Sequence, residues 1–175
     1  MQNTWRVGAC VVVAVTLAVV PHAESFADAV LAVVVSGLLM MQTPLDVRTR
    51  HLSRRATVVA TALVGAVILV EVVGGDVGVR SGGMAVGTAA VVVAIYALLH
   101  RFSPRSLGWG DVLLVAPLGL ALGYVAADRV AVWQLLASTT GAIHVLALRR
   151  LRGVRIIPFG PHLLVAAWLV LLASI

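Results

Sequence analysis

Long apolar runs separated by short polar segments make up most of the chain. The runs are continuously apolar rather than alternating, which argues against half-buried strands. A helix needs about 20 residues to cross a bilayer and satisfies its own backbone hydrogen bonds there. The pattern therefore predicts an all-α, polytopic transmembrane bundle of six to seven spans. The approximate runs are Trp5–Val20, Phe26–Met41, Ala56–Val73, Met84–Leu99, Val112–Ala127, Val130–Leu148 and His162–Ser174.

Composition strengthens this prediction. Apolar residues make up 61% of the chain and charged residues 11%, and the mean hydropathy is +1.07. A soluble domain is roughly 45–50% apolar and about 25% charged, so an ordinary soluble fold and a disordered chain are both excluded. The 175 residues leave room for a single integral-membrane domain, 1–175, and for no sizeable aqueous domain.

The basic residues, all arginines, alternate between the two ends of the predicted spans. A net charge of +6 in a soluble protein would suggest nucleic-acid binding, but this placement fits membrane orientation, and we expect no nucleic-acid partner. Positive residues favour the cytoplasmic side, so the N-terminus is predicted to be cytoplasmic. We expect the protein to lie in the plasma membrane. One side carries Arg6, Arg48, Arg50, Arg54, Arg55, Arg101, Arg105, Arg149, Arg150, Arg152 and Arg155, and the other carries Arg80 and Arg129.

The first run also has features of a secretory signal. However, Pro21 and His22 stand where small residues would be needed for cleavage after Ala23, and we expect this run to be retained as a helix. Cys10 is the only cysteine, which excludes an intramolecular disulfide and a CxxC zinc site. The histidines show no paired metal-ligand spacing. We therefore expect neither a metal nor a cofactor.

Two acidic residues stand apart from the other five. Asp46 and Asp111 are the only acids on the predicted inner side, each at the edge of an apolar run. Asp46 follows the second run, and Asp111 opens the fifth in Gly108-Trp109-Gly110-Asp111. We expect the shared membrane face to bring them to a similar depth. The remaining acids lie at or near the outer side: Glu24, Asp28, Glu71, Asp76 and Asp128.

Two carboxylates that approach closely cannot both ionise easily and titrate jointly. One keeps a proton and acts as a general acid, while the other deprotonates a water, so the pair can hydrolyse a peptide bond without a metal or a covalent nucleophile. Glycines 108 and 110 allow a sharp turn and a close substrate chain, and Trp109 can anchor at the interface. The residues alone leave two other roles open: a helix N-cap for Asp111, and a salt bridge from Asp46 to Arg48 or Arg50.

Three segments, in this order, resemble motifs of the type IV prepilin peptidases, the GxGD membrane aspartyl proteases. They are Asp46-Val47-Arg48-Thr49-Arg50, Gly108-Trp109-Gly110-Asp111-Val112 and Ile157-Pro158-Phe159-Gly160-Pro161. The resemblance implies that Asp46 and Asp111 are the catalytic pair. We expect Gly108, Trp109, Gly110, Pro158, Phe159 and Gly160 to contact the substrate. The last segment has a simpler alternative, a rigid turn into the final helix.

The resemblance also implies a substrate and a reaction. The substrate would be a prepilin or pseudopilin with a short basic leader, cleaved after a leader glycine at the cytoplasmic face. The chain departs from the family where Leu52-Ser53 replaces the common Ile-Pro and where Leu113 replaces a frequent lysine. With one cysteine and no cysteine-rich insertion, it looks like the short form, which has peptidase activity only and no methyltransferase region.

Two non-enzymatic alternatives remain: a transporter or channel subunit that uses the inner acids for ion passage, and an inactive pilus-assembly factor. Polar residues are scattered within the apolar runs, whereas a transporter would show a polar stripe. His51, His144 and His162 are expected to be interfacial or hydrogen-bonded rather than catalytic. Glycines within the runs, and Gly119 with Gly123 in particular, are expected to allow close helix packing.

Overall fold

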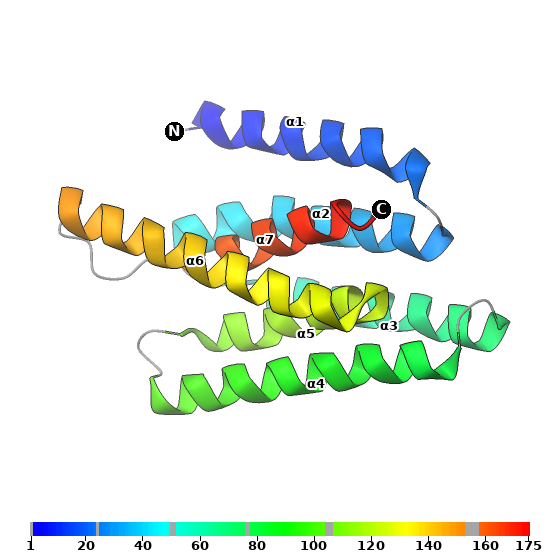
Figure 1. Ribbon diagram of the computed structural model, residues 1–175. Coiled ribbons are helices and arrows are strands. Elements are labelled where there is room, and N and C mark those ends of the chain that lie inside the picture. Colours follow the sequence, from blue (N-terminus) through cyan, green and yellow to red (C-terminus); the bar gives the residue numbers. More distant parts are fainter. Residues whose placement is uncertain (1, 24, 50–51, 76–77, 104–106, 153–157) are drawn as a thin grey trace.

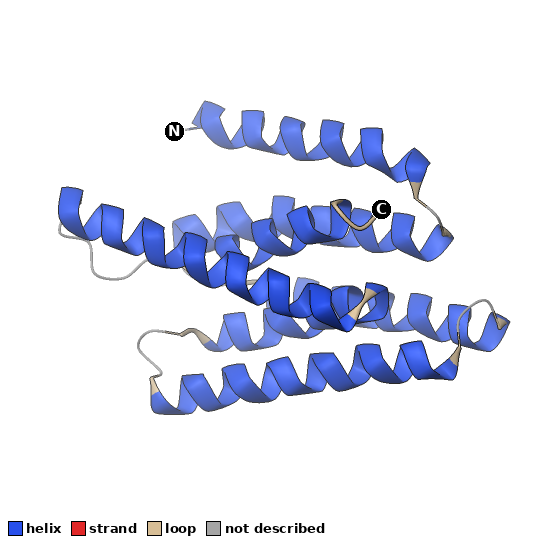
Figure 2. Ribbon diagram, viewed as in Figure 1, coloured by secondary structure: helices blue, strands red, loops and turns tan. Residues whose placement is uncertain are grey.

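The computed structural model describes residues 2–23, 25–49, 52–75, 78–103, 107–152 and 158–175. These residues form seven α-helices and one short 3-10 helix, and no strand occurs among them (Figure 2). The prediction of an all-α fold is therefore confirmed. The elements are α1 (Gln2–Val19), η1 (Val20–His22), α2 (Phe26–Thr49), α3 (Arg54–Gly74), α4 (Val79–Phe102), α5 (Trp109–Val125), α6 (Ala127–Arg152) and α7 (Gly160–Leu172).

Consecutive helices run in opposite directions (Figure 1). The C-terminal ends of α2, α4 and α6 therefore lie at the same end of the bundle as the N-terminal ends of α3, α5 and α7, on the left in Figure 1. Described arginines at these helix ends are Arg54, Arg55, Arg101, Arg149 and Arg150, whereas Arg80 and Arg129 belong to the opposite end. The alternation predicted from the arginines is thus present in the helix arrangement.

Four of the described helices, α2, α3, α4 and α6, are long and apolar enough to cross a membrane. The other three apolar segments are shorter: Val7–His22, Trp109–Val125 and Gly160–Leu172. Many large apolar side chains on α3 and α4 point outwards, among them Leu63, Leu69, Ile95 and Leu98. Helices that are apolar on their exposed faces as well as inside are typical of a membrane bundle.

Helix α5 is the centre of the bundle and packs against α3, α4, α6 and α7. Its Leu114, Leu118 and Leu122 are almost completely buried, as are Leu163 and Leu164 of α7. This central position explains how a helix of only 17 residues is held in place. It also fixes α5 at the level where its first turn meets the end of α2.

The predicted close packing at Gly119 and Gly123 is confirmed. A Cβ at Gly119 would lie 3.0 Å from the Ala89 Cα on α4, and one at Gly123 would lie 3.2 Å from the Ala85 Cα. The same prediction is wrong for Gly37, Gly65 and Gly87, where a Cβ would have nothing within 4 Å. The sequence around these three glycines is apolar like that around Gly119 and Gly123, but no neighbouring helix in the described part of the chain packs against them.

We expect Gly123→Ala to destabilise the bundle by about 1–3 kcal/mol, the usual cost of overpacking. The new methyl would overlap the Thr88 side chain and press on the α4 backbone. Thermal unfolding in detergent micelles, followed by circular dichroism, measures the effect. Gly87→Ala on α4 is the control, because its methyl would meet open space. Equal midpoints for the two variants would contradict the close contact between α4 and α5 at Gly123.

One boundary differs from the prediction in a way that affects the site. We expected Asp46 to follow the second helix, but α2 continues to Thr49 and includes Asp46. Pro44 lies inside this helix. It removes one backbone hydrogen bond, but its fixed φ suits a helix, so the neighbouring turns continue. Asp46 is therefore held by regular helix rather than by a loop.

Candidate active site

Asp46 and Asp111 come from different helices and both are buried, with 6% and 7% of their surfaces exposed. Asp46 lies in the last turn of α2 and Asp111 in the first turn of α5. Charged side chains are rarely buried unless they are paired or functional. The predicted sharing of one end of the bundle by the two aspartates is thus found in the structure.

The first turn of α5 orients Asp111. Gly108 is the N-cap residue, and the Asp111 Oδ2 accepts a hydrogen bond of 3.2 Å from the Gly108 N–H. Asp111 is therefore not the N-cap residue that the sequence left open as an alternative, but it does satisfy a backbone N–H that the helix leaves unpaired. Its other oxygen, Oδ1, is directed towards the start of α7.

Gly160, the first residue of α7, lies between the two carboxylates. A Cβ at this position would be 2.7 Å from the Asp46 Oδ2 and 3.3 Å from the Asp111 Oδ1. Because both distances start from one point, the two oxygens lie within about 6 Å of each other, a range in which like charges interact strongly. Three helix ends, those of α2, α5 and α7, thus bring two acids together. A side chain at position 160 would require the Asp46 carboxylate to shift.

Leu52 closes one side of this arrangement. Its Cβ lies 3.1 Å from a Cβ position at Gly110, and its Cδ1 lies 3.4 Å from the one at Gly160. Leu52 precedes α3 in sequence, so a fourth segment of the chain contacts the glycines beside both aspartates. A salt bridge from Asp46 to Arg48 or Arg50 involves side chains outside the described part of the chain.

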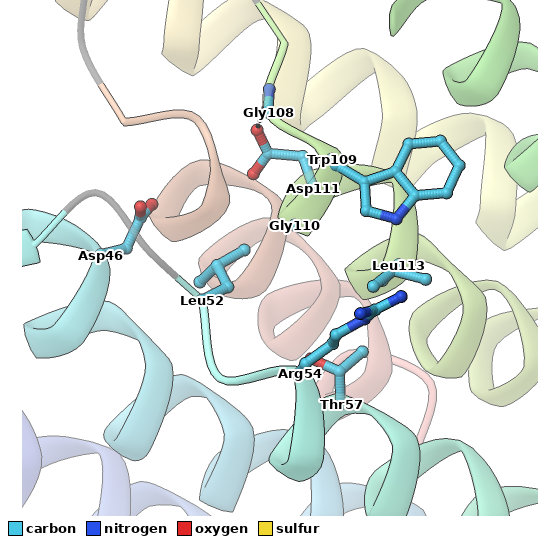
Figure 3. Close-up of a pocket in the computed structure, with 9 residues that line it drawn as sticks. All are labelled: Asp46, Leu52, Arg54, Thr57, Gly108, Trp109, Gly110, Asp111 and Leu113. Carbon is cyan, nitrogen blue, oxygen red and sulfur yellow. Dashed lines mark hydrogen bonds between the residues drawn. The ribbon is translucent and has the colours of Figure 1, made fainter.

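An open pocket of about 400 Å³ adjoins the two acids (Figure 3). Figure 3 shows the Asp111 carboxylate directed to the side of the pocket on which Asp46 lies, with Leu52 between the two helices. Trp109 and Arg54 form an exposed rim. The lining residues are Asp46, Leu52, Arg54, Thr57, Gly108, Trp109, Gly110, Asp111 and Leu113. The pocket is partly open, and the two acids that line it are buried.

The residues predicted to contact substrate fall into two groups. Gly108, Trp109 and Gly110 line the pocket with the aspartates, and Gly160 separates the carboxylates. Pro158 instead lines a second cavity between α6 and α7, and the Phe159 ring packs where a side chain at Gly141 would stand, 2.8 Å from a Cβ there. Substrate contact stays a prediction for all six residues.

The histidines expected to be hydrogen-bonded fit that expectation where they are described. The His144 Nδ1 and the His162 Nε2 are 3.0 Å apart and join α6 to α7. His51 lies outside the described residues. Neither described histidine lines the pocket that holds the aspartates.

Sequence reasoning missed His100, which supports the turn before Asp111. Its Nδ1 lies 2.7 Å from the Leu107 carbonyl oxygen, and its ring contacts Trp109 with centroids 5.3 Å apart. It also missed Gln42 and Leu52. No signal in the sequence marks His100 or Gln42, because their partners lie in other segments of the chain. Leu52 stands out in the sequence only as a departure from the family's common Ile-Pro.

The chain is similar in sequence to curated proteins that share one name. The chain is 31% identical over 109 residues to the prepilin leader peptidase/N-methyltransferase of Aeromonas hydrophila, covering 60% of this chain and 37% of that protein. It is 36% identical over 98 residues to the protein of the same name from Aeromonas salmonicida strain A449, covering 52% of this chain and 33% of that one.

The chain spans about a third of the length of these curated relatives. No family profile matches the sequence, and no solved structure matches it. Over about half its length, this chain with its two buried aspartates is therefore similar to proteins named as prepilin leader peptidases.

Proposed function

We propose that this chain is a membrane aspartyl endopeptidase that removes the leader of prepilin-like proteins at the cytoplasmic membrane face, with Asp46 and Asp111 as its catalytic pair. The observation that carries the proposal is the convergence of two buried carboxylates on Gly160 beside an open pocket. The similarity to proteins named prepilin leader peptidase supports the substrate class. We propose only the peptidase activity in that name for this chain, because peptide hydrolysis is the chemistry that an acid pair performs.

The proposed reaction needs one proton shared by the two carboxylates. The ionised carboxylate takes a proton from water as the water oxygen attacks the scissile carbonyl carbon. The protonated carboxyl gives its proton to the carbonyl oxygen. When the tetrahedral intermediate collapses, the C–N bond breaks. The leaving nitrogen takes the proton that came from water, and the hydroxyl proton returns to the second carboxylate. The pair ends as it began.

The bundle also suits the proposed substrate. The apolar helix of a prepilin can lie in the bilayer beside the exposed apolar faces of the bundle, with its leader junction at the level of the pocket. The arginines at this end of the helices suit the cytoplasmic side and contacts with anionic lipid headgroups. The peptide bond and the acid pair then meet at the same depth without either leaving the membrane interface.

The test is processing of a prepilin encoded in the same genome, with both proteins inserted in the same membranes. We expect a single cut between the leader and the apolar helix, identified by mass spectrometry of the new N-terminus. A wild-type protein that inserts but leaves this prepilin intact, while pilus assembly still depends on it, would contradict the proposal and favour the assembly-factor alternative.

A further inference from the structure

The side-chain amide of Gln42 is completely buried at the junction of α2 and α3. Its Oε1 accepts a hydrogen bond of 2.8 Å from the Ser53 N–H, and its Nε2 donates to the Ser53 carbonyl oxygen at 3.0 Å. The Nε2 also donates to the Thr57 Oγ1 at 3.1 Å. One side chain thus binds both backbone groups of the residue that caps α3. A buried amide without hydrogen-bond partners costs free energy, so these three bonds fix the position of the Gln42 side chain relative to α3.

The residue next to Ser53 is Leu52, which contacts the Cβ positions of both Gly110 and Gly160. Gly110 directly precedes Asp111, and Gly160 lies between the two carboxylates. Gln42 stands one helical turn before Asp46 on α2, and residues four apart share a face of a helix. The amide therefore ties the helix that carries one aspartate to the segment that packs beside the other.

We propose that Gln42 is a positioning residue that, through the Ser53 backbone and Leu52, holds α2 and α5 at the separation that the Asp46–Asp111 pair needs. The inference rests on the proposed function and deepens it. The Gln42 amide controls the alignment of the acid pair, although it touches neither the substrate nor the reacting atoms. Its effect is therefore on kcat, with KM for the prepilin unchanged.

The Ser53 N–H offers a way to break one bond of this link without touching Gln42. Ser53 has φ −71°, an angle that proline also adopts, but proline has no N–H to donate. Ser53→Pro therefore removes the 2.8 Å bond while fitting the backbone angle, and its ring Cδ, which replaces the N–H hydrogen, also displaces the Gln42 amide. It also removes the Ser53 hydroxyl, which caps the Ala56 N–H at 3.4 Å. Ser53→Ala is the matched control, since it loses the hydroxyl and keeps the N–H.

The experiment measures kcat and KM for prepilin processing by the full chain in detergent micelles, for both Ser53 variants with Gln42 present and in a Gln42→Leu background. With Gln42 present, we expect Ser53→Pro to have a kcat at least fivefold below that of Ser53→Ala, with the same KM. In the Gln42→Leu background, where no acceptor remains, the two should agree within twofold. Such non-additivity is the signature of two groups that act through one contact.

A thermal midpoint measured for every variant keeps the test informative if one folds poorly. Thr57→Val provides a milder second probe: it breaks the Nε2 bond to the hydroxyl, together with the 3.1 Å bond from that hydroxyl to the Ser53 carbonyl oxygen. We expect Thr57→Val to lower kcat and leave KM unchanged. The inference is overturned if Ser53→Pro lowers kcat by the same factor with and without Gln42. It is also overturned if the variants change only KM or only the thermal midpoint. Either result leaves the peptidase proposal intact. A wild type without processing activity overturns both.

Discussion

Replacing either aspartate by asparagine should abolish prepilin processing while the protein still inserts and folds. General acid or base catalysis by one positioned group contributes roughly 10²–10⁴-fold, so we expect Asp46→Asn and Asp111→Asn each to lose activity on that scale. Asparagine keeps the shape of the side chain but neither accepts a proton from water nor donates one to the carbonyl. Initial rates of leader removal in membranes measure the loss.

Asp128→Asn is the matched control for these variants. Asp128 lies in the first turn of α6, at the end of the bundle away from the acid pair, and its loss should leave the rate unchanged. The double variant Asp46→Asn with Asp111→Asn should be no slower than either single variant, because residues that act in one step are not additive. A single variant that keeps near-normal activity would remove that aspartate from the mechanism.

Gly160→Ala should produce the second largest loss. The new methyl would stand 2.7 Å from the Asp46 Oδ2 and 3.3 Å from the Asp111 Oδ1, closer than ordinary contact on the first side. The Asp46 carboxylate must then shift, which changes its position relative to Asp111. A displacement of about 1 Å in a reacting group can cost on the order of 10²-fold, so we expect a fall in kcat of about that size.

The control is Gly37→Ala in the middle of α2, where nothing lies within 4 Å of the added methyl. It introduces the same atoms on the helix that carries Asp46 but away from the pair, and full activity is expected. Normal processing by Gly160→Ala would show that the carboxylates tolerate a methyl between them. That outcome would contradict the geometry on which the proposed mechanism depends.

The helical class and the seven helices follow from local information. Each helix overlaps one apolar run, because hydrocarbon penalises unpaired backbone at every residue, and a helix satisfies these groups within one segment. The location of Asp46 and Asp111 at one end of the bundle was also predictable, since alternating helix directions place the ends of α2 and α5 there. The sidedness of the arginines predicted only a similar depth, and the pairing of the two aspartates was implied by the resemblance of the motifs around them.

The finer features depend on contacts between distant segments, which periodicity does not encode. The second apolar run ends before Pro44, although α2 continues through this proline to Asp46 and beyond. Pro158 and Gly160 stand two residues apart in one motif, yet one lines the cavity between α6 and α7 while the other separates the acids. Nothing in the sequence distinguishes Gln42, because its partners are backbone groups of Ser53 and a hydroxyl on α3.

The proximity of residues 46 and 111, which the ends of α2 and α5 bring together, can be measured without any substrate. In a Cys10→Ser background, which removes the exposed native cysteine, cysteines are placed at positions 46 and 111 and treated with a short bifunctional thiol reagent in membranes. We expect an efficient intramolecular cross-link for this pair and none for cysteines at 46 and 128. No cross-link between 46 and 111, with both thiols shown to react singly, would contradict the proximity of the two residues.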